Sequence, residues 1–242
     1  MMTLYQFPCH WGLPNASPFC LKLETYLRMI EMPYEIRFVM DPRKSPKGKL
    51  PCLKIEGELL SDSELIIDHL KEKYGDVLDG QLREDQRALM TLLDNTFTER
   101  LYWFIVYYRW QQDAGWAFVK EGFFGKLPWL ARLFVPNSVR KATLNALHQQ
   151  GTGRHKPEEV FKLATKTLDA IAITLGDKKY FLGAEMTSID ATAFAFLANI
   201  VWVPYEDPLK SYLQKYSNIL NYCERIWSIF YPEIERPFPL VK

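Results

Sequence analysis

Ser17-Pro18-Phe19-Cys20 follows a short apolar stretch, residues 3–7, and starts the pattern of an amphipathic helix. Serine is a preferred helix N-cap residue, and proline suits the first helical turn because its missing N–H group is not needed there. Apolar residues then recur at the three- and four-residue spacing of one buried helix face, at Cys20, Leu23, Leu27 and Ile30. The sequence therefore predicts a strand followed by a helix that begins at a serine hydroxyl.

The start of this helix is a suitable place for thiol chemistry. Free backbone N–H groups and the positive end of the helix dipole stabilise an anion there, and the Cys-x-x-Cys of thiol–disulfide enzymes uses the same place. Here Ser17 stands at the first cysteine position and Cys20 at the second. A serine hydroxyl can stabilise another molecule's thiolate, but it cannot form a mixed disulfide. The alternative interpretation of Ser17 is an N-cap that holds no ligand.

Two later segments extend the pattern. Gly48-Lys49-Leu50-Pro51 precedes a strand-like stretch, residues 52–55, and an X-Pro bond at a strand start is a candidate for the cis form. The residue before the proline is held extended, so its backbone groups can pair with a peptide ligand. After a further short strand, Ser61-Asp62-Ser63 caps a helix whose apolar positions are Leu65, Ile66 and Leu70.

This order of elements resembles the thioredoxin-like domain of the glutathione transferase superfamily. Residues 15–28, 45–51 and 151–155 resemble more closely the branch that contains the failed axon connections proteins and the metaxins. The resemblance implies glutathione as the co-substrate, with Ser17 facing its sulfur. It also implies that Leu50, before Pro51, pairs with the glutathione backbone, and that Asp62-Ser63 binds its γ-glutamyl end.

Two further residues are candidates for the same site. Arg43, Lys44, Lys47 and Lys49 form a solvated turn, from which Lys49 is placed to meet the glycyl carboxylate of glutathione. Trp11 lies in a loop too long for a tight turn between strand and helix, and it is a candidate wall of the site. Tyr5 is a weaker candidate, because the two-residue period of the strand points it to the opposite face.

The second part of the chain is predicted to be helical. Glycine and aspartate interrupt the pattern near residues 74–80, and helical periodicity follows over residues 83–110 and 157–175. Thr187 and Asp190 form a variant capping box before an apolar, buried helix, which is a structural role. The expected fold is α/β plus all-α: a thioredoxin-like glutathione-binding domain over residues 1–77 and an all-helical domain over residues 84–242.

Aromatic residues are dense in this second part. Residues 102–108 have a core-like composition, but the family places its electrophile site beside this helix, which makes Tyr102, Trp103 and Tyr107 the candidate substrate pocket. Residues 116–136 carry aromatics that look exposed, together with several basic residues. This segment is expected to cover the pocket, form a subunit contact or lie against a membrane surface.

Composition excludes several classes of function. Thirty basic against 29 acidic residues leave no global field to attract nucleic acid, and no apolar run reaches the ~20 residues of a membrane span. No export signal is recognised at Met1, and four cysteines without a repeating spacing suggest reduced thiols in the cytoplasm. Cys9-His10 with Cys20 lacks the spacing of a metal site, and Cys20 is expected to be a buried apolar residue.

The function expected from the sequence is that of a glutathione transferase, acting as a homodimer. Glutathione would bind to the first domain, Ser17 would stabilise its thiolate, and the helical domain would offer a cavity for a hydrophobic electrophile. One alternative is a non-catalytic interaction module, because the metaxin-like relatives include sorting proteins. The other is a glutathione-dependent thiol reductase, which the serine at position 17 disfavours.

Overall fold

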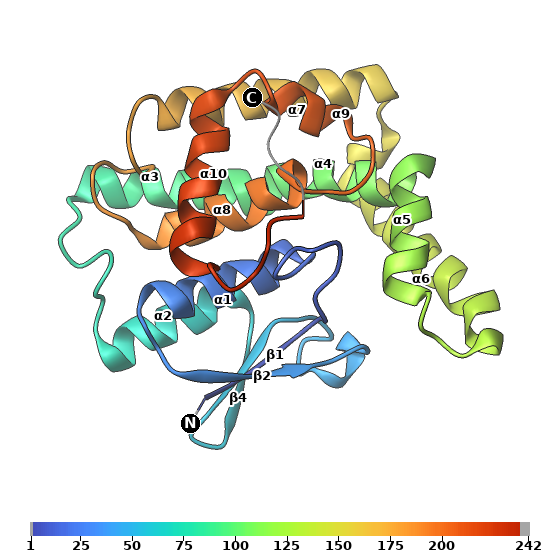
Figure 1. Ribbon diagram of the computed structural model, residues 1–242, viewed down its shortest axis with the longest axis horizontal. Coiled ribbons are helices and arrows are strands. Elements are labelled where there is room, and N and C mark those ends of the chain that lie inside the picture. Colours follow the sequence, from blue (N-terminus) through green and yellow to red (C-terminus); the bar gives the residue numbers. More distant parts are fainter. Residues whose placement is uncertain (1, 238–242) are drawn as a thin grey trace.

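The computed structural model describes residues 2–237, and its first part is a four-stranded sheet. The strands are β1 (Met2–Gln6), β2 (Tyr34–Phe38), β3 (Cys52–Ile55) and β4 (Glu58–Ser61), in the order β2-β1-β3-β4. β1 runs parallel to β2 and antiparallel to β3, which pairs antiparallel with β4. Helices α1 (Pro18–Met29) and α2 (Ser63–Tyr74) cover one face of the sheet (Figure 1). The predicted thioredoxin-like arrangement is confirmed.

The core of this layer lies between the sheet and its two helices. Leu4 and Leu53 from the strands are fully buried against Leu23 and Leu27 of α1 and Ile66 of α2. The prediction for Leu65 was wrong, because its side chain is exposed and Ile67 is buried instead. Successive helix positions are about 100° apart, so the face that buries Ile66, Ile67 and Leu70 turns Leu65 toward solvent.

The rest of the described chain is helical. Its first helical run comprises α3 (Glu84–Asn95), α4 (Tyr102–Val106) and two wider π-type segments, Thr96–Leu101 and Tyr107–Gln111. The long helix predicted over residues 83–110 is therefore confirmed, with widened turns that periodicity alone does not reveal. The later helices are α5 (Asp113–Phe124), α6 (Trp129–Gln150), α7 (Pro157–Leu175), α8 (Ser188–Val201), α9 (Pro208–Leu213) and α10 (Ser217–Phe230).

Helix α8 lies at the centre of the helical layer and is buried along its whole length. The predicted capping box is confirmed: Asp190 accepts hydrogen bonds from the Thr187 N–H at 2.9 Å and the Thr187 hydroxyl at 3.0 Å. The same carboxylate accepts from the Phe181 N–H at 3.0 Å and the Tyr222 hydroxyl at 3.1 Å. Burial raises the pKa of Asp190, and the four hydrogen bonds oppose this effect because they stabilise the carboxylate in the core.

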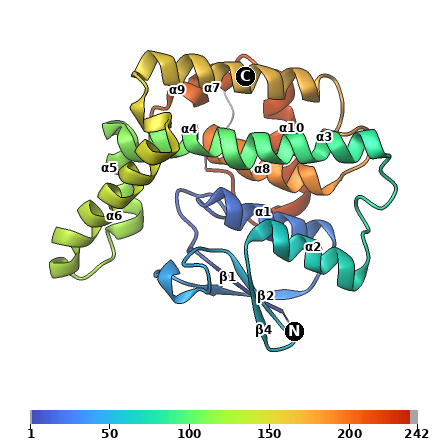
Figure 2. The same cartoon turned by 180° about the vertical axis from the view of Figure 1, so that it is seen from behind.

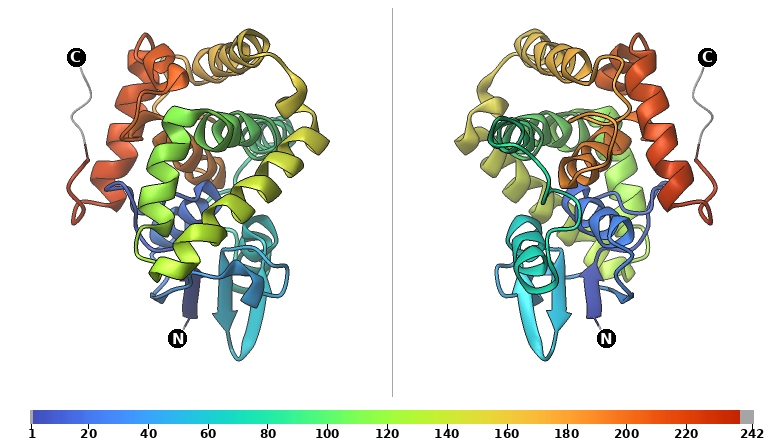
Figure 3. Two further views of the ribbon diagram at one scale, coloured as in Figure 1. Left: turned by 90° about the vertical axis from the view of Figure 1, so that its right-hand side faces the viewer. Right: turned by 90° about the vertical axis from the view of Figure 1, so that its left-hand side faces the viewer.

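The two layers meet where α1 packs against α8, with α2 at the side (Figure 2). The side views show the sheet, then α1 and α2, then the helical layer (Figure 3). Polar contacts cross this boundary inside the protein. Lys22 of α1 forms a 2.8 Å ion pair with Asp94 of α3, which also accepts from the Thr192 hydroxyl of α8 at 2.7 Å. Thr25 and Tyr231 are joined by a 2.9 Å hydrogen bond.

Candidate functional site

The three segments singled out in the sequence meet at one end of the sheet. Cys52 of β3 pairs with Tyr5 of β1 on one side and with Ser61 of β4 on the other. Pro51 and Asp62, one residue beyond these pairs, are therefore at the same end as the loop from β1 to α1. Cys20, in the first turn of α1, shares a buried cluster with Leu50 and Cys52. The helix start at Ser17, the X-Pro bond and the helix start at Asp62 thus surround a common region.

Ser17 is the N-cap residue of α1, as predicted. Its backbone is extended (φ −94°, ψ 116°), and its Oγ atom accepts from the Cys20 N–H at 3.5 Å. A bond of that length is weak, because N–H···O bonds are most favourable near 2.9 Å. The side chain is partly exposed, with Pro18 in the first helical turn. The Ser17 hydroxyl is therefore held at the start of α1, but its hydrogen bond to the helix backbone is weak.

Cys20 is fully buried, which confirms the prediction of an apolar role. Burial raises the pKa of its thiol to about 12, and a hydrogen bond from Ser17 lowers it by a smaller amount. Cys20 therefore stays protonated at neutral pH. The four cysteines are all free, and among them only Cys9 is exposed.

The loop that leads into α1 is held by the helical layer. Arg109, whose side chain is buried, donates from Nη1 to the Ala16 carbonyl at 2.5 Å. Its Nη2 donates to the carbonyl and to Oδ1 of Asn199 in α8, at 3.2 and 3.1 Å. Asn199 in turn donates to the Asn15 carbonyl at 3.2 Å. The backbone just before Ser17 is thus bonded to two residues that come from distant parts of the chain.

Asn15 continues this arrangement from inside the loop. Its side-chain amide donates to the Phe7 carbonyl at 2.8 Å, and its Oδ1 accepts from the Ser17 N–H at 2.9 Å. Asn15 therefore links the end of β1 to the cap of α1. We name Asn15, Ala16, Arg109 and Asn199 the cap clamp. Its members fix the position of Ser17 through backbone atoms rather than through the Ser17 side chain.

Trp11 packs against the helical layer. Its ring stacks on Phe123 of α5 at 4.9 Å between centroids, and the Arg109 guanidinium lies 5.0 Å from its centroid. A Cβ atom on Gly122 would come within 2.7 Å of the Trp11 Nε1 atom, so glycine is needed for this close approach. The predicted wall residue therefore closes the loop against α5.

The X-Pro segment has the predicted geometry. The Leu50–Pro51 peptide bond is cis, and both residues are buried. The Lys49 carbonyl accepts from the Ser45 hydroxyl at 2.6 Å, while the Lys49 side chain is exposed to solvent. This places a cation near the end of the sheet where Ser17 and Asp62 lie.

Asp62 is the N-cap residue of α2 and has an uncommon backbone conformation. Its φ angle is 86°, a region that side chains other than glycine enter at a cost of about 1–3 kcal/mol. One carboxylate oxygen accepts from the Glu64 N–H at 3.1 Å, and the side chain is exposed. Ser63, directly after it, is buried at the first helical position. A strained, exposed carboxylate at a helix start is typical of a ligand-binding position.

The three candidate pocket residues occupy different environments. Tyr102 is partly buried, and its ring meets Phe19, in the first turn of α1, edge to face at 5.0 Å. Trp103 is also partly buried and lies 5.3 Å from the Tyr102 ring. Tyr107 differs, because its side chain is almost fully buried within the core of the helical layer. Tyr102 and Trp103 are thus more exposed to solvent than Tyr107, and Tyr102 contacts the first turn of α1.

Two hollows lie away from the Ser17 start. A wide, shallow one of about 510 Å³ is lined by the end of α1 and by α10, and Arg28 fills part of it with bonds to Glu24 and Glu233. Another, of about 280 Å³, lies between α5 and α6. Within residues 2–237, no group of three or more His, Cys, Asp and Glu side chains is placed to hold a metal ion.

The sequence interpretation missed the cap clamp. Arg109 does carry a signal, because it is a cation within the aromatic run Tyr107-Tyr108-Arg109-Trp110 of a predicted core helix. Buried charged residues need specific partners, so a cation at this position indicates that hydrogen-bond acceptors lie close to it in the fold. No comparable signal marks Asn15 or Asn199, since asparagine is common in loops and its partners here come from distant parts of the sequence.

Two segments match models of known protein families. Residues 18–115 match the glutathione S-transferase N-terminal domain, and residues 164–226 match the glutathione S-transferase C-terminal domain. Solved structures agree in fold. A glutathione S-transferase III in its apo form gives a TM-score of 0.61 over 100% of this chain and 99% of that chain, at 17% identity. An unclassified glutathione S-transferase of Bombyx mori gives 0.63 over 98% and 93%, at 18% identity.

Similar sequences include one enzyme of nearly the same length. The isoprene-epoxide–glutathione S-transferase of Rhodococcus sp. (strain AD45) is 34% identical over 93% of this chain and 98% of that protein. Failed axon connections of Drosophila melanogaster is 32% identical over 96% of this chain. Metaxin-1 of Homo sapiens is 30% identical over 96% of this chain. The chain spans 59% and 51% of the lengths of the latter two proteins.

Proposed function

We propose that this chain, which belongs to the glutathione S-transferase family, binds glutathione and transfers it to a small apolar electrophile. Similar chains also include failed axon connections and metaxin-1, whose names do not state a transferase activity. The observation that carries them is the meeting of the Ser17 helix start, the cis Leu50–Pro51 bond and the Asp62 helix start at one end of the sheet.

Each part of glutathione has a complementary group in this region. Asp62 accepts a hydrogen bond from the ligand's α-amino group, and the start of α2 with Ser63 receives the α-carboxylate. Leu50 offers extended backbone groups to the central peptide, and the exposed Lys49 ammonium meets the glycyl carboxylate. Ser17 then donates a hydrogen bond from its hydroxyl to the sulfur. The sulfur competes with Cys20 for that hydrogen bond, but Cys20 is a neutral thiol and the weaker acceptor.

Stabilising the thiolate is the chemical contribution of Ser17. A free thiol has a pKa of about 8.5, and lowering it by two units takes roughly 2.7 kcal/mol of preference for the charged form. One charge-assisted hydrogen bond and a helix N-terminus together supply an amount of this order. The resulting thiolate is the nucleophile, and no cysteine of this chain takes part in the transfer.

A small epoxide is the electrophile class that we propose, from the name of the Rhodococcus relative. The thiolate attacks an epoxide carbon, so a C–S bond forms, a C–O bond breaks, and the ring oxygen takes a proton from water. Burial raises the pKa of Tyr102, which keeps its hydroxyl protonated and able to donate a hydrogen bond to that oxygen. Phe19, Tyr102 and Trp103 supply the apolar wall.

Calorimetric titration with reduced glutathione is the first test, followed by a conjugation assay with a small epoxide. We expect saturable binding at one site per chain and a product with a thioether bond. Titrating the glutathione-loaded protein with an apolar epoxide should also quench tryptophan emission, and Trp103→Phe should remove part of that quenching. Glutathione binding without conjugation would limit the function to binding. No binding at all would favour a non-catalytic interaction module that keeps the fold.

A further inference from the structure

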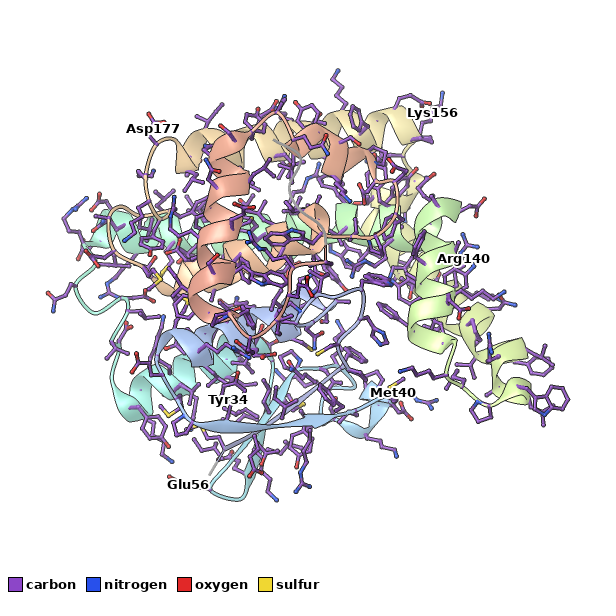
Figure 4. The ribbon with its side chains drawn as sticks, in the orientation of Figure 1. Tyr34, Met40, Glu56, Arg140, Lys156 and Asp177 are labelled. Atoms are coloured by element: carbon purple, nitrogen blue, oxygen red, sulfur yellow. The ribbon has the colours of Figure 1, made fainter. Side chains whose placement is uncertain are left out.

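Helix α5 and the first half of α6 form an arm that projects from the body of the protein (Figure 1). The arm is attached at its base. Arg140 of α6, which is labelled in Figure 4, donates to the Trp110 carbonyl at 2.9 Å and to the Gln111 carbonyl at 3.1 Å, and its guanidinium lies 4.9 Å from the Trp116 ring. Trp116, predicted to be exposed, is instead buried under this contact. The base of the arm is therefore packed against the body of the protein, and the outer part of the arm is exposed to solvent.

The outer part carries an apolar stripe on α6. Trp129 and Phe134 are 71% and 72% exposed, and Leu130 and Leu133 are 56% and 55% exposed. Positions 129 and 133, and 130 and 134, are one helical turn apart, so the four side chains share one face. We call these four residues the arm stripe. Pro136, farther along the same helix, is buried and lines the hollow between α5 and α6.

Basic residues surround the arm stripe. Residues 113–141 contain the five cations Lys120, Lys126, Arg132, Arg140 and Lys141 against two acidic residues, Asp113 and Glu121, while the whole chain is nearly balanced. Lys126 lies at the tip, three residues before Trp129, and Lys141 lies seven residues after Phe134 on the same face. Both are exposed. Arg132 is near Glu121 at 3.8 Å, and Arg140 is near Asp113 at 3.2 Å.

We propose that the arm stripe docks this protein on the surface of a lipid bilayer that carries anionic lipids. Tryptophan and phenylalanine are suited to the boundary between headgroups and acyl chains, where an apolar ring can leave water. Lys126 and Lys141 flank the stripe at both ends, and their long side chains can reach lipid phosphates while the stripe inserts. Within residues 2–237 no helix is long and apolar enough to cross a bilayer, so the arm lies at the surface.

The charge of the arm favours a bilayer over a second copy of this chain. Two arms meeting stripe to stripe would bring their lysines together, and like charges across an interface oppose association. An anionic surface has the opposite effect, because each lysine is attracted to it and the apolar stripe then gains by leaving water. This docking does not rest on glutathione binding, since none of its residues belongs to the candidate site.

Vesicle sedimentation tests the proposal with the full chain. We expect binding to phosphatidylcholine vesicles that contain phosphatidylserine, weak binding to pure phosphatidylcholine, and release at high salt because salt screens the lysines. Trp129→Ser combined with Phe134→Ser should weaken binding by tenfold or more, and Lys126→Glu combined with Lys141→Glu should weaken it by a similar factor. Trp129 emission should shift to shorter wavelength on binding.

The controls use matched residues on α7, away from the arm. Ile173, which is 76% exposed, is replaced by serine, and the exposed Lys162 and Lys166 are replaced by glutamate; neither change should affect vesicle binding. Equal binding to both kinds of vesicle, or unchanged binding of the Trp129→Ser/Phe134→Ser protein, would overturn the proposal. So would a dimer in solution that this double variant converts to a monomer, because the stripe would then belong to a second copy.

Discussion

The two helix starts of the candidate site, at Ser17 and at Asp62, are held in different ways. The loop before Ser17 is bonded to Arg109 and to Asn199, both from the helical layer. Asp62 relies on its own helix, through bonds to the Glu64 N–H and from the Ile66 N–H to its carbonyl. The sulfur end of the site therefore depends on contact between the two layers, whereas the amino end depends on the sheet layer alone.

The two cap residues, Ser17 and Asp62, also differ in backbone conformation. Ser17 has an ordinary extended conformation, so the helical layer fixes its position without straining it. Asp62 has a φ angle of 86°, and the strain is stored locally in an exposed loop. Changes in the helical layer should thus act on Ser17, and changes at Asp62 should act on ligand affinity without disturbing the fold.

Arg109→Ala should give the largest effect. It leaves the Ala16 carbonyl and the Asn199 side chain without their buried donor, so we expect the free energy of unfolding to fall by about 3 kcal/mol in urea denaturation. Arg100→Ala is the matched control on the same helical run, since Arg100 is partly exposed and lies over the Phe104 ring. Its loss should stay below about 1 kcal/mol. Equal losses in the two variants would contradict a special role for the cap clamp.

Asp62→Ala should come next, and should act on binding. Removing a charge-assisted bond of roughly 1.5–3 kcal/mol weakens glutathione affinity by about tenfold or more in calorimetric titration. Loss of the cap lowers stability by only about 1 kcal/mol, so the protein stays folded. Asp62→Asn keeps a capping side chain and removes the charge, which separates the two effects. Unchanged affinity in both folded variants would remove Asp62 from the proposed site.

Ser17→Ala should act on the bound thiol alone. We expect the pKa of bound glutathione to rise by about one unit, as followed by ultraviolet titration of the thiolate, while glutathione affinity stays within about tenfold. Ser17→Cys should gain disulfide exchange, because a cysteine at a helix N-terminus has a lowered pKa and can attack a disulfide. If wild type already exchanges disulfides as fast, or the bound pKa does not move, Ser17 is only an N-cap.

Asp207→Asn should give the smallest effect, and one that depends on pH. Burial raises the pKa of Asp207, the N-cap of α9, to about 6, so the folded protein holds this proton more tightly than the unfolded chain does. The resulting stabilisation is complete at acid pH and is lost as pH rises through about 6. Asparagine also caps helices but does not ionise. Asp207→Asn should therefore match wild type near pH 4 and exceed its stability at pH 7.

Thermal or urea unfolding at several pH values would measure this difference. A gap that is constant with pH would show that Asp207 is already ionised, or already neutral, across the whole range. A gap that widens when Arg109 is also replaced would show that the Arg109 charge holds the pKa of Asp207 down.

Local chemistry explains which predictions from the sequence succeeded. Ser17 and Pro18, the cis Leu50–Pro51 bond and the Thr187–Asp190 capping box are each decided by a few neighbouring residues, and the structure has all of them. Leu65 and Trp116 were misjudged because the sequence shows how apolar residues are spaced but not which neighbouring element covers them.

The sequence by itself determined the order of elements, the family to which the chain is similar and the residues that begin α1 and α2, because helix caps and turns depend on side chains close to them in the chain. The tertiary structure alone decided that Arg109 and Asn199 would meet the backbone before Ser17, and that Trp129 and Phe134 would remain in solvent. Both outcomes depend on how helices far apart in the sequence pack, since burial and long-range hydrogen bonds exist only once the layers are assembled.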